Sequence, residues 1–282
     1  MVRQSTSADT GAPDNEFLAR EVERTIMDYS WAWEGEREHV EQLDGAVLRW
    51  LDVPWFGLDG MVVHVSCDPA RVDEQLDAIV ARSEDGGRRC WWVVGPSAQP
   101  AGITDHILAR GFVKGVEWAG LALRDLSAPF PMTPGLVVEP LSRANAEDYA
   151  ALCAEVSPPD DPRVRDERLA AAHRYVDAAG PDTAIYLGRL DGEAAACVVS
   201  HIEPSGVMYL RNAVTLPRYR NRGVYLSLVG YRLAVARDAG CRAAVVQAQA
   251  DTSAPILLKR GFERVCTIWG LSRPDTPAPA SS

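Results

Sequence analysis

Residues 216–225 read LPRYRNRGVY and carry the clearest indication of how the chain folds. They follow an apolar run at 207–215 and precede a stretch in which apolar residues recur at helical spacing, so they join a strand to a helix. Backbone amides at such a junction, together with the positive end of the helix dipole, favour an anion. Arg218, Arg220 and Arg222 add positive charge, and the segment is therefore interpreted as a phosphate-binding loop.

The sequence around this loop predicts a regular series of elements. Alternating and continuous apolar runs predict strands, and apolar residues three or four apart predict helices. Asp191-Gly192 is typical of a tight hairpin turn. The expected order is a strand at 137–141, helices at 145–156 and 162–178, strands at 184–190, 194–202 and 207–215, a helix at 223–239, a strand at 243–248, a short helix ending at 260, and a last strand.

An internal repeat indicates that this unit is present twice. ILARGF at 107–112 resembles LLKRGF at 257–262, and a Gly-Leu dipeptide follows each at the same offset, at 120–121 and 270–271. In each copy we expect a helix that ends at Arg-Gly-Phe, where the glycine supplies a left-handed cap. A strand follows each helix, with Trp118 or Trp269 near its end.

The linker between the copies is predicted at 129–135, where three prolines in PFPMTPG interrupt both helix and strand. The first copy then spans 15–128 and the second 136–272. Residues 1–14 and 273–282 are rich in Ser, Thr, Ala, Pro and Asp, and we expect both tails to be disordered because they offer little apolar surface.

The first copy is expected to be degenerate. A strand at 61–65, a helix at 70–82, a strand at 90–94 and a helix at 103–110 follow the second half of the same order. The loop at 66–72 contains no glycine, one aspartate and one arginine, so it is not expected to hold a phosphate.

The second copy resembles the GNAT superfamily of acyl-CoA N-acyltransferases. Its signature is Arg/Gln-x-x-Gly-x-Gly/Ala, and residues 220–225 fit it except at Tyr225. The resemblance covers the whole second copy and implies an α/β fold (α+β, with a mixed sheet), built here as two tandem GNAT-like domains, each a mixed, mostly antiparallel sheet flanked by helices. It also implies acetyl-CoA or another acyl-CoA as co-substrate.

The resemblance assigns residues to the CoA site. Amides of the loop hold the pyrophosphate, and the backbone of the preceding strand bonds the pantetheine arm. The residues so implied are Ala213, Val214, Thr215, Arg220, Asn221, Arg222, Gly223, Val224, Tyr225 and Leu226. Tyr225 departs from the family because a bulky side chain stands where backbone usually approaches phosphate.

The catalytic groups are harder to assign. Many relatives have a tyrosine four residues before the glycine of the Gly-Phe step, where it protonates the thiolate, but this chain has Leu257 there. The central strands carry amides and arginine instead of a carboxylate base. Asp251 is the catalytic candidate, with capping of the following helix as the alternative. Ser253 is likewise either a proton donor or a cap.

For the acceptor, Asp160 and Asp161 in SPPDDP at 157–162 are candidates to attract a cationic amine, and Arg211 is assigned to substrate binding. The alternative for the aspartates is an Asp-Pro helix start, and the two roles are compatible. Among five histidines, only His201 is placed near the cleft, and a packed or surface imidazole is the alternative.

The composition excludes several classes. A net charge of −10 and a pI near 5.0 argue against a nucleic-acid partner. No stretch approaches the ~18 apolar residues of a membrane span. Six scattered cysteines without C-x-x-C spacing suggest neither a metal site nor a disulfide framework, so we expect a cytoplasmic protein, monomer or homodimer.

The leading functional hypothesis is therefore an acyl-CoA-dependent N-acyltransferase, with acetyl-CoA as the expected donor, that transfers directly to a small-molecule amine. One alternative is a non-catalytic GNAT-fold protein that binds CoA or another ligand. Another is a GNAT-fold enzyme with different acyl-CoA chemistry, such as decarboxylation or hydrolysis.

Overall fold

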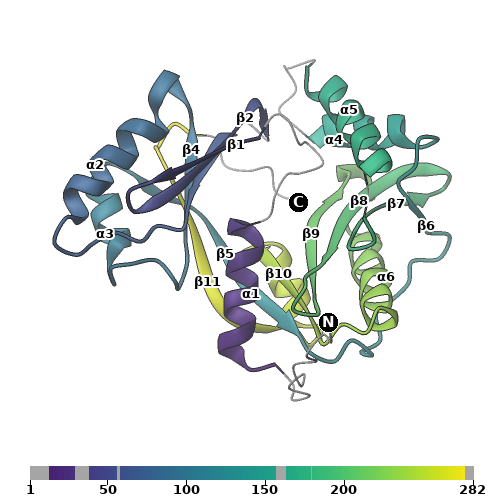
Figure 1. Cartoon of the computed structure of the whole chain (residues 1–282). Coiled ribbons are helices and arrows are strands. Elements are labelled where there is room, and N and C mark those ends of the chain that lie inside the picture. The colour runs from purple at the N-terminus through teal and green to yellow at the C-terminus, as the bar shows by residue number, and fades with distance from the viewer. Residues whose placement is uncertain (1–12, 29–37, 56–57, 157–162, 179, 277–282) are drawn as a thin grey trace, which may run out of the picture.

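The computed structural model describes residues 13–28, 38–55, 58–156, 163–178 and 180–276. These residues form one mixed sheet of 11 strands in the order β1-β2-β3-β4-β11-β5-β10-β9-β8-β7-β6. The sheet bends so that its two arms face each other, and helix α1 (Asn15–Met27) stands between them (Figure 1). Only the β3–β4 and β9–β10 pairs are parallel among the described strands, so the predicted mixed, mostly antiparallel sheet is confirmed.

The first copy of the repeat supplies α1, five strands and two further helices. A hairpin of two strands precedes the parallel pair β3–β4, which α2 connects. The bounds are β1 Glu38–Leu43, β2 Ala46–Trp55, β3 Leu58–Val63, α2 Val72–Ser83, β4 Cys90–Val94, α3 Ile103–Leu108 and β5 Val113–Leu123. Helix α1 and the β1–β2 hairpin are additions to the elements that the sequence predicted.

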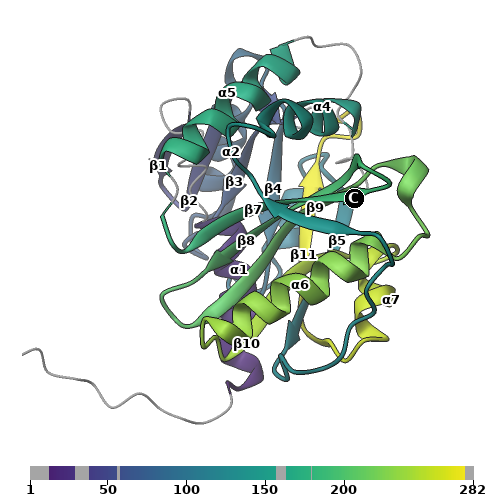
Figure 2. The same cartoon turned by 90° about the vertical axis from the view of Figure 1, so that its right-hand side faces the viewer.

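The second copy follows the predicted order closely. Its elements are β6 Val137–Pro140, α4 Ala146–Val156, α5 Arg163–Ala178, β7 Thr183–Leu190, β8 Glu193–Ile202, β9 Val207–Thr215, α6 Val224–Asp238, β10 Ala243–Gln249, α7 Ser253–Leu258 and β11 Glu263–Ser272. Figure 2 shows α4 and α5 above the strands β7–β9 and α6 below them. Asp191 and Gly192 both have positive φ, as the predicted hairpin turn between β7 and β8 requires.

The last strands of the two copies are exchanged. Strand β5 of the first copy lies between β11 and β10, and β11 of the second copy lies between β4 and β5. The two copies therefore share one continuous sheet, with a pseudo-symmetric centre where β5 and β11 pair. The domain boundaries at 128 and 136 remain a prediction, because they divide the sequence but not the sheet.

The Arg-Gly-Phe steps behave as expected. Gly111 and Gly261 have φ of +84° and +90° and turn the chain from α3 into β5 and from α7 into β11. Phe112 packs in a cluster that contains Leu271 of β11, and Phe262 packs in one that contains residues of β5. In each copy, the phenylalanine of the repeat therefore packs against the last strand of the other copy. Trp118 lies in the middle of β5 and not near its end.

The two faces of the central strands pack against different helices. On one face, Leu18 and Val22 of α1 join Tyr209 and Val245 in one buried cluster. On the other, Leu210 and residues of β10 pack with α6 and α7. None of the helices in the described ranges has both the length and the apolar run needed to cross a bilayer.

Two positions assigned to the tails take part in the fold. Asp14 is the N-cap of α1, where its side chain accepts a hydrogen bond of 2.7 Å from the amide of Phe17. Arg273 forms an ion pair with Glu84 and donates to the backbone carbonyl of Arg110. The tail residues 1–12 and 277–282 lie outside the described residues.

Candidate functional site

The sheet opens between β9 and β10. The two strands are paired only where 207–209 faces 243–245, although β9 continues to Thr215 and β10 to Gln249. A break in the β8–β9 register and a φ of +38° at Asn212 mark an irregularity of β9 at this place. Beyond Tyr209, the side of β9 turned toward β10 has no strand partner in the described structure, so its backbone groups face a gap.

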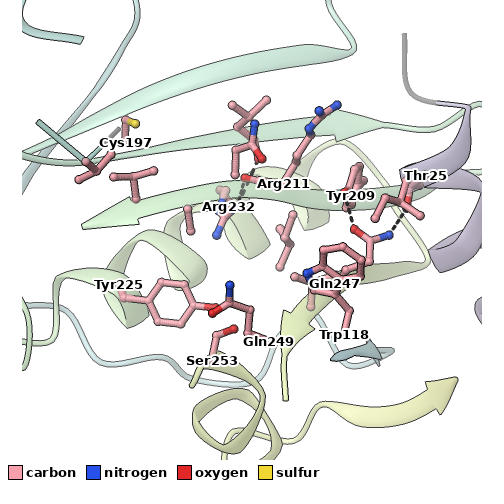
Figure 3. Close-up of a pocket in the computed structure, with 18 of the residues that line it drawn as sticks. Thr25, Trp118, Cys197, Tyr209, Arg211, Tyr225, Arg232, Gln247, Gln249 and Ser253 are labelled. Atoms are coloured by element: carbon pink, nitrogen blue, oxygen red, sulfur yellow. Dashed lines mark hydrogen bonds between the residues drawn. The ribbon is translucent and has the colours of Figure 1, made fainter. Parts of the chain in front are cut away.

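A cavity of about 240 Å³ lies at this gap (Figure 3). Its walls come from both faces of the sheet: Thr25 and Ile26 of α1 on one side, Tyr225 of α6 and Leu257 of α7 on the other. Helices α4 and α5 add a third wall. Because the strands part here, the cavity passes through the sheet, and two molecules that enter from opposite faces can meet in it.

The phosphate loop lies at the α6 end of this cavity. Gly223 is the N-cap of α6 with φ +80° and without a side-chain capping bond, and Asn221 also has positive φ. The first-turn amides of α6 are thus left for an outside acceptor. Of the ten residues predicted to bind CoA, four line the cavity: Ala213, Val214, Arg220 and Tyr225. Thr215, Asn221, Arg222, Gly223, Val224 and Leu226 flank it in the chain.

The three arginines of the loop are differently engaged. Arg220 reaches into the cavity, and its Nε donates to the carbonyl of Thr215 at 3.1 Å. Arg222 pairs with Asp191 at 2.9 Å, and Arg218 pairs with Glu155, all four side chains being exposed. Exposed ion pairs contribute only ~0–1 kcal/mol, so a phosphate can replace these carboxylates at small cost.

Tyr225 was noted in the sequence only as a departure from the family. Its ring extends across the α6 end of the cavity, and the hydroxyl lies beside Gln249 and Ser253 (Figure 3). Burial raises the pKa of this phenol, and the nearby cation of Arg232 partly offsets that effect. Leu257, at the place of the usual tyrosine, is fully buried and lines the same cavity.

Arg232 of α6 is a cavity residue that sequence reasoning missed. Its side chain is 1% exposed, and it donates hydrogen bonds to the carbonyls of Leu228, Val199 and Arg211. The carbonyls of Val199 and Arg211 belong to the irregular stretches of β8 and β9, so Arg232 links these two strands where β9 separates from β10. Burial lowers the pKa of its guanidinium to about 10. A charged residue four positions after Leu228 on an apolar helix was the available signal.

The first copy forms the other end of the cavity. Met61, Trp91 and Trp118 line it from β3, β4 and β5, and the two indole rings lie 5.4 Å apart. Gln247 of β10 is fixed by α1, since its Nε2 donates to Thr25 Oγ1 at 2.9 Å. This end of the cavity is therefore aromatic, and it is built by the first copy.

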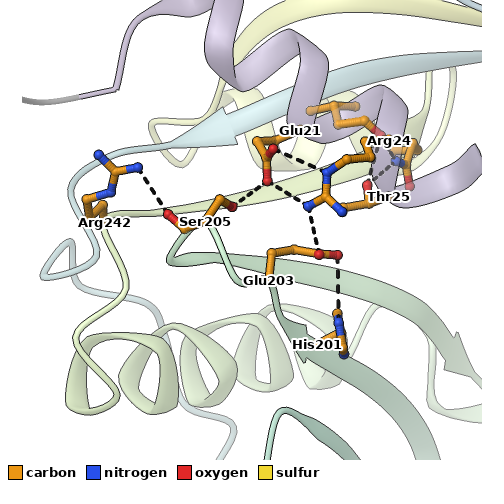
Figure 4. Close-up of polar contacts among 9 residues, drawn as sticks. Glu21, Arg24, Thr25, His201, Glu203, Ser205 and Arg242 are labelled. Carbon is orange, nitrogen blue, oxygen red and sulfur yellow. Dashed lines mark hydrogen bonds and ion pairs between the residues drawn. The ribbon is translucent and has the colours of Figure 1, made fainter. Parts of the chain in front are cut away.

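Helix α1 is held to the second copy by a polar cluster (Figure 4). Arg24 Nη2 lies 2.9 Å from Glu21 and 2.7 Å from Glu203, and both carboxylates are less than a tenth exposed. Ser205 Oγ donates to Glu21. His201 contacts Glu203 at 3.8 Å and Thr183 Oγ1 at 2.6 Å, and it is not among the described cavity residues, so the alternative of a packed imidazole is the one found.

The remaining predicted site residues divide into two groups. Arg211 lines the cavity, and its assignment to substrate binding stays a prediction. Asp251 is exposed and is not among the described cavity residues, and Thr252, not Asp251, is the N-cap of α7, without a side-chain capping bond. The catalytic role of Asp251 therefore stays a prediction without support from its position. Asp160 and Asp161 lie outside the described residues.

The loop of the first copy differs from the phosphate loop in a way that explains its degeneracy. Its amides are already used: Asp68 N donates to Gln75 Oε1 at 2.7 Å, Cys67 N to the carbonyl of Gln99 at 2.9 Å, and Ala70 N to Asp68 Oδ1. An anion would have to displace these internal acceptors.

Part of the chain matches a known protein family. The profile of the Acetyltransferase (GNAT) family matches residues 147–262, while no curated protein sequence matches the chain. A GCN5-related N-acetyltransferase from Kribbella flavida is 19% identical, with 91% of this chain and 95% of that chain covered and a TM-score of 0.64. A GCN5-related N-acetyltransferase from Sphaerobacter thermophilus is 13% identical, with 96% and 97% covered and a TM-score of 0.58.

A tandem GNAT protein from the clavulanic acid biosynthesis pathway is 16% identical, with 93% of this chain and 95% of that chain covered and a TM-score of 0.56. At these identities the solved structures establish the fold alone. Residues 147–262 therefore match a GNAT acetyltransferase domain, and the chain as a whole has a fold similar to that of tandem GNAT proteins.

Proposed function

We propose that the protein is an acyl-CoA-dependent N-acetyltransferase that acts on a small-molecule amine by direct transfer. The observation that carries this proposal is the cavity at the β9–β10 gap, which is lined from both faces of the sheet. One end adjoins the open first turn of α6, and the other is lined by aromatic residues of the first copy. Donor and acceptor can thus approach one another from opposite faces, as direct transfer requires.

The residues present fit a CoA thioester. Gly223 lies in the left-handed region, and a Cβ there would come within 2.8 Å of Thr133 Oγ1, so only glycine keeps the turn that exposes the amides. The β9 edge that runs on to Thr215 is not paired with β10 beyond Tyr209, and an extended amide-containing arm could bond this edge as an added strand. Arg220 lies between these two features and complements the charge of a diphosphate.

The residues of this chain would serve the reaction mainly by position. Backbone amides of the irregular stretch of β9 are donors for the oxygen of the thioester carbonyl as it gains charge. Trp91 and Trp118 exclude water from the acceptor side and hold an apolar part of the amine. Gln247, fixed by Thr25, offers a polar contact between the two ends.

The experiment that tests the proposal is calorimetric titration of the protein with acetyl-CoA and with free CoA, followed by a thiol-release assay with a panel of small amines. We expect binding of both and release of thiol only when a suitable amine is present. Absence of binding would refute the phosphate-loop assignment. If the protein binds both molecules but releases thiol slowly and at the same rate with and without amines, the transferase proposal is refuted.

A second candidate is a GNAT-fold protein that binds an acyl-CoA without transferring the acyl group to an amine, or that hydrolyses or decarboxylates it. The observation in its favour is that, among the described cavity residues, none is an Asp or Glu, and Leu257 cannot donate a proton. Product analysis by mass spectrometry distinguishes the candidates, because only the transferase yields an N-acylated amine.

A further inference from the structure

Amine acylation needs a proton for the departing thiolate, and the cavity holds a limited set of groups that can give one. The described tyrosines that line it are Tyr149, Tyr209 and Tyr225. Tyr149 lies on α4, 2% exposed, and burial raises its pKa well above the usual value. Tyr209 faces α1 and donates its hydroxyl hydrogen to Gln247 Oε1.

Tyr225 is placed differently. It belongs to the first turn of α6, directly after the phosphate loop, and it packs against the cluster of residues from α6, α7 and β10 that contains Leu257. Its hydroxyl points across the cavity toward Gln249 and Ser253 (Figure 3). Within the described part of the chain this hydroxyl makes no hydrogen bond, so its proton is available to a molecule in the cavity.

The electrostatic surroundings of Tyr225 suit a proton donor. Arg232 lies in the same wall, fully buried, and its hydrogen bonds go to backbone carbonyls. An uncompensated buried cation stabilises a phenolate that forms nearby. Burial keeps the phenol protonated at neutral pH, and Arg232 limits the cost of its ionisation.

Resting on the proposed transferase function, we propose that Tyr225 is the catalytic acid that protonates the leaving thiolate, with Arg232 as the group that stabilises the resulting phenolate. The amine nitrogen forms a bond to the acyl carbon, the carbon–sulfur bond breaks, and the sulfur takes the phenolic proton. After the attack the nitrogen is positively charged, and it loses one proton, which passes through water to the phenolate oxygen of Tyr225. The products are the amide and the free thiol, and the enzyme is unchanged.

The test is Tyr225→Phe, which removes the hydroxyl and keeps the ring. We expect kcat for thiol release to fall by about 10²-fold, the lower range for loss of an acid–base group, while the calorimetric Kd for CoA and the KM for the amine stay within about twofold. Tyr231→Phe is the matched control: it lies on the same helix and packs against Tyr186 with ring centroids 5.0 Å apart. It should retain wild-type kcat.

Replacement of Tyr225 by a difluorotyrosine gives a second readout. A general acid acts only while protonated, so kcat falls as pH rises through the pKa of the phenol, and fluorination should move that fall to lower pH. A wild-type kcat in Tyr225→Phe would overturn the proposal, as would a loss confined to CoA affinity, which would mark the residue as part of the binding wall. If the wild-type protein binds CoA but releases no thiol with any amine, the transferase function itself has failed, and this inference falls with it.

Discussion

Replacing Arg24 tests how firmly the first copy is joined to the second copy. In Arg24→Met, Glu21 and Glu203 lose the guanidinium that lies 2.9 and 2.7 Å from them, while both remain less than a tenth exposed. Breaking a fully buried pair costs about 3–5 kcal/mol. Because the Arg24 side chain is 36% exposed, we reduce this to about 2–3 kcal/mol of unfolding free energy.

The assay is urea unfolding at pH 5 and pH 8, with Arg20→Met as control. Arg20 pairs with Glu16 on the same helix, and both side chains are largely exposed, so this change should cost less than about 0.5 kcal/mol. For the wild type, the pairing with Glu21 and then Glu203 raises the pKa of Arg24, so its contribution is fully present below the usual arginine pKa and does not vary between pH 5 and 8.

In Arg24→Met the two carboxylates are left without their cation. Since α1 supplies Thr25 and Ile26 to the cavity, KM for the amine should rise while CoA affinity is retained. A cost equal to that of Arg20→Met would refute this reasoning.

Other substitutions test the loop, the shared sheet and the predicted base. Gly223→Asp should weaken CoA binding at least 10-fold by calorimetry, because the new side chain clashes with its neighbours and repels the pyrophosphate. Gly240→Asp, also at positive φ but in open space, should leave CoA affinity unchanged. Equal effects of the two substitutions would contradict the loop assignment. Gly270→Ala places a Cβ 2.6 Å from Val116 Cγ1 and should lower the free energy of unfolding by about 1–3 kcal/mol. An unchanged free energy in urea unfolding would show that β11 and β5 are not tightly packed there. Asp251→Asn should leave kcat and its pH profile within twofold, and a large loss would restore the predicted catalytic role.

The sequence predicted the second copy well because its signals are local. The loop at 216–225, the Asp191-Gly192 turn and the glycine caps each depend on a few adjacent residues, and the structure places them as expected. Helix α1 was missed for a physical reason: its buried face includes Glu21, Glu23 and Thr25, each of which has a partner in a distant segment of the chain. Polar residues on a buried face hide the apolar period by which helices are recognised.

The strand exchange could not be read from the sequence either. Alternation of side chains determines which face of a strand is buried but not which strand lies beside it. Consequently the aromatic wall from Met61, Trp91 and Trp118 could not be assigned to the cleft of the second copy. Arg232 and the orientation of Tyr225 likewise depend on the gap between β9 and β10, which arises from tertiary packing.

The position of β11 has a consequence for how the chain reaches its native state. Strand β11 is synthesised more than a hundred residues after β4 and β5 and is inserted between them, in the interior of the sheet. Neither half can close its hydrophobic core before β11 has been made, and such long-range pairing slows folding. A nascent chain that stops short of 263 leaves β4 and β5 with exposed edges, which favour aggregation. The two halves are therefore expected to mature as one unit, and neither is expected to fold when expressed alone.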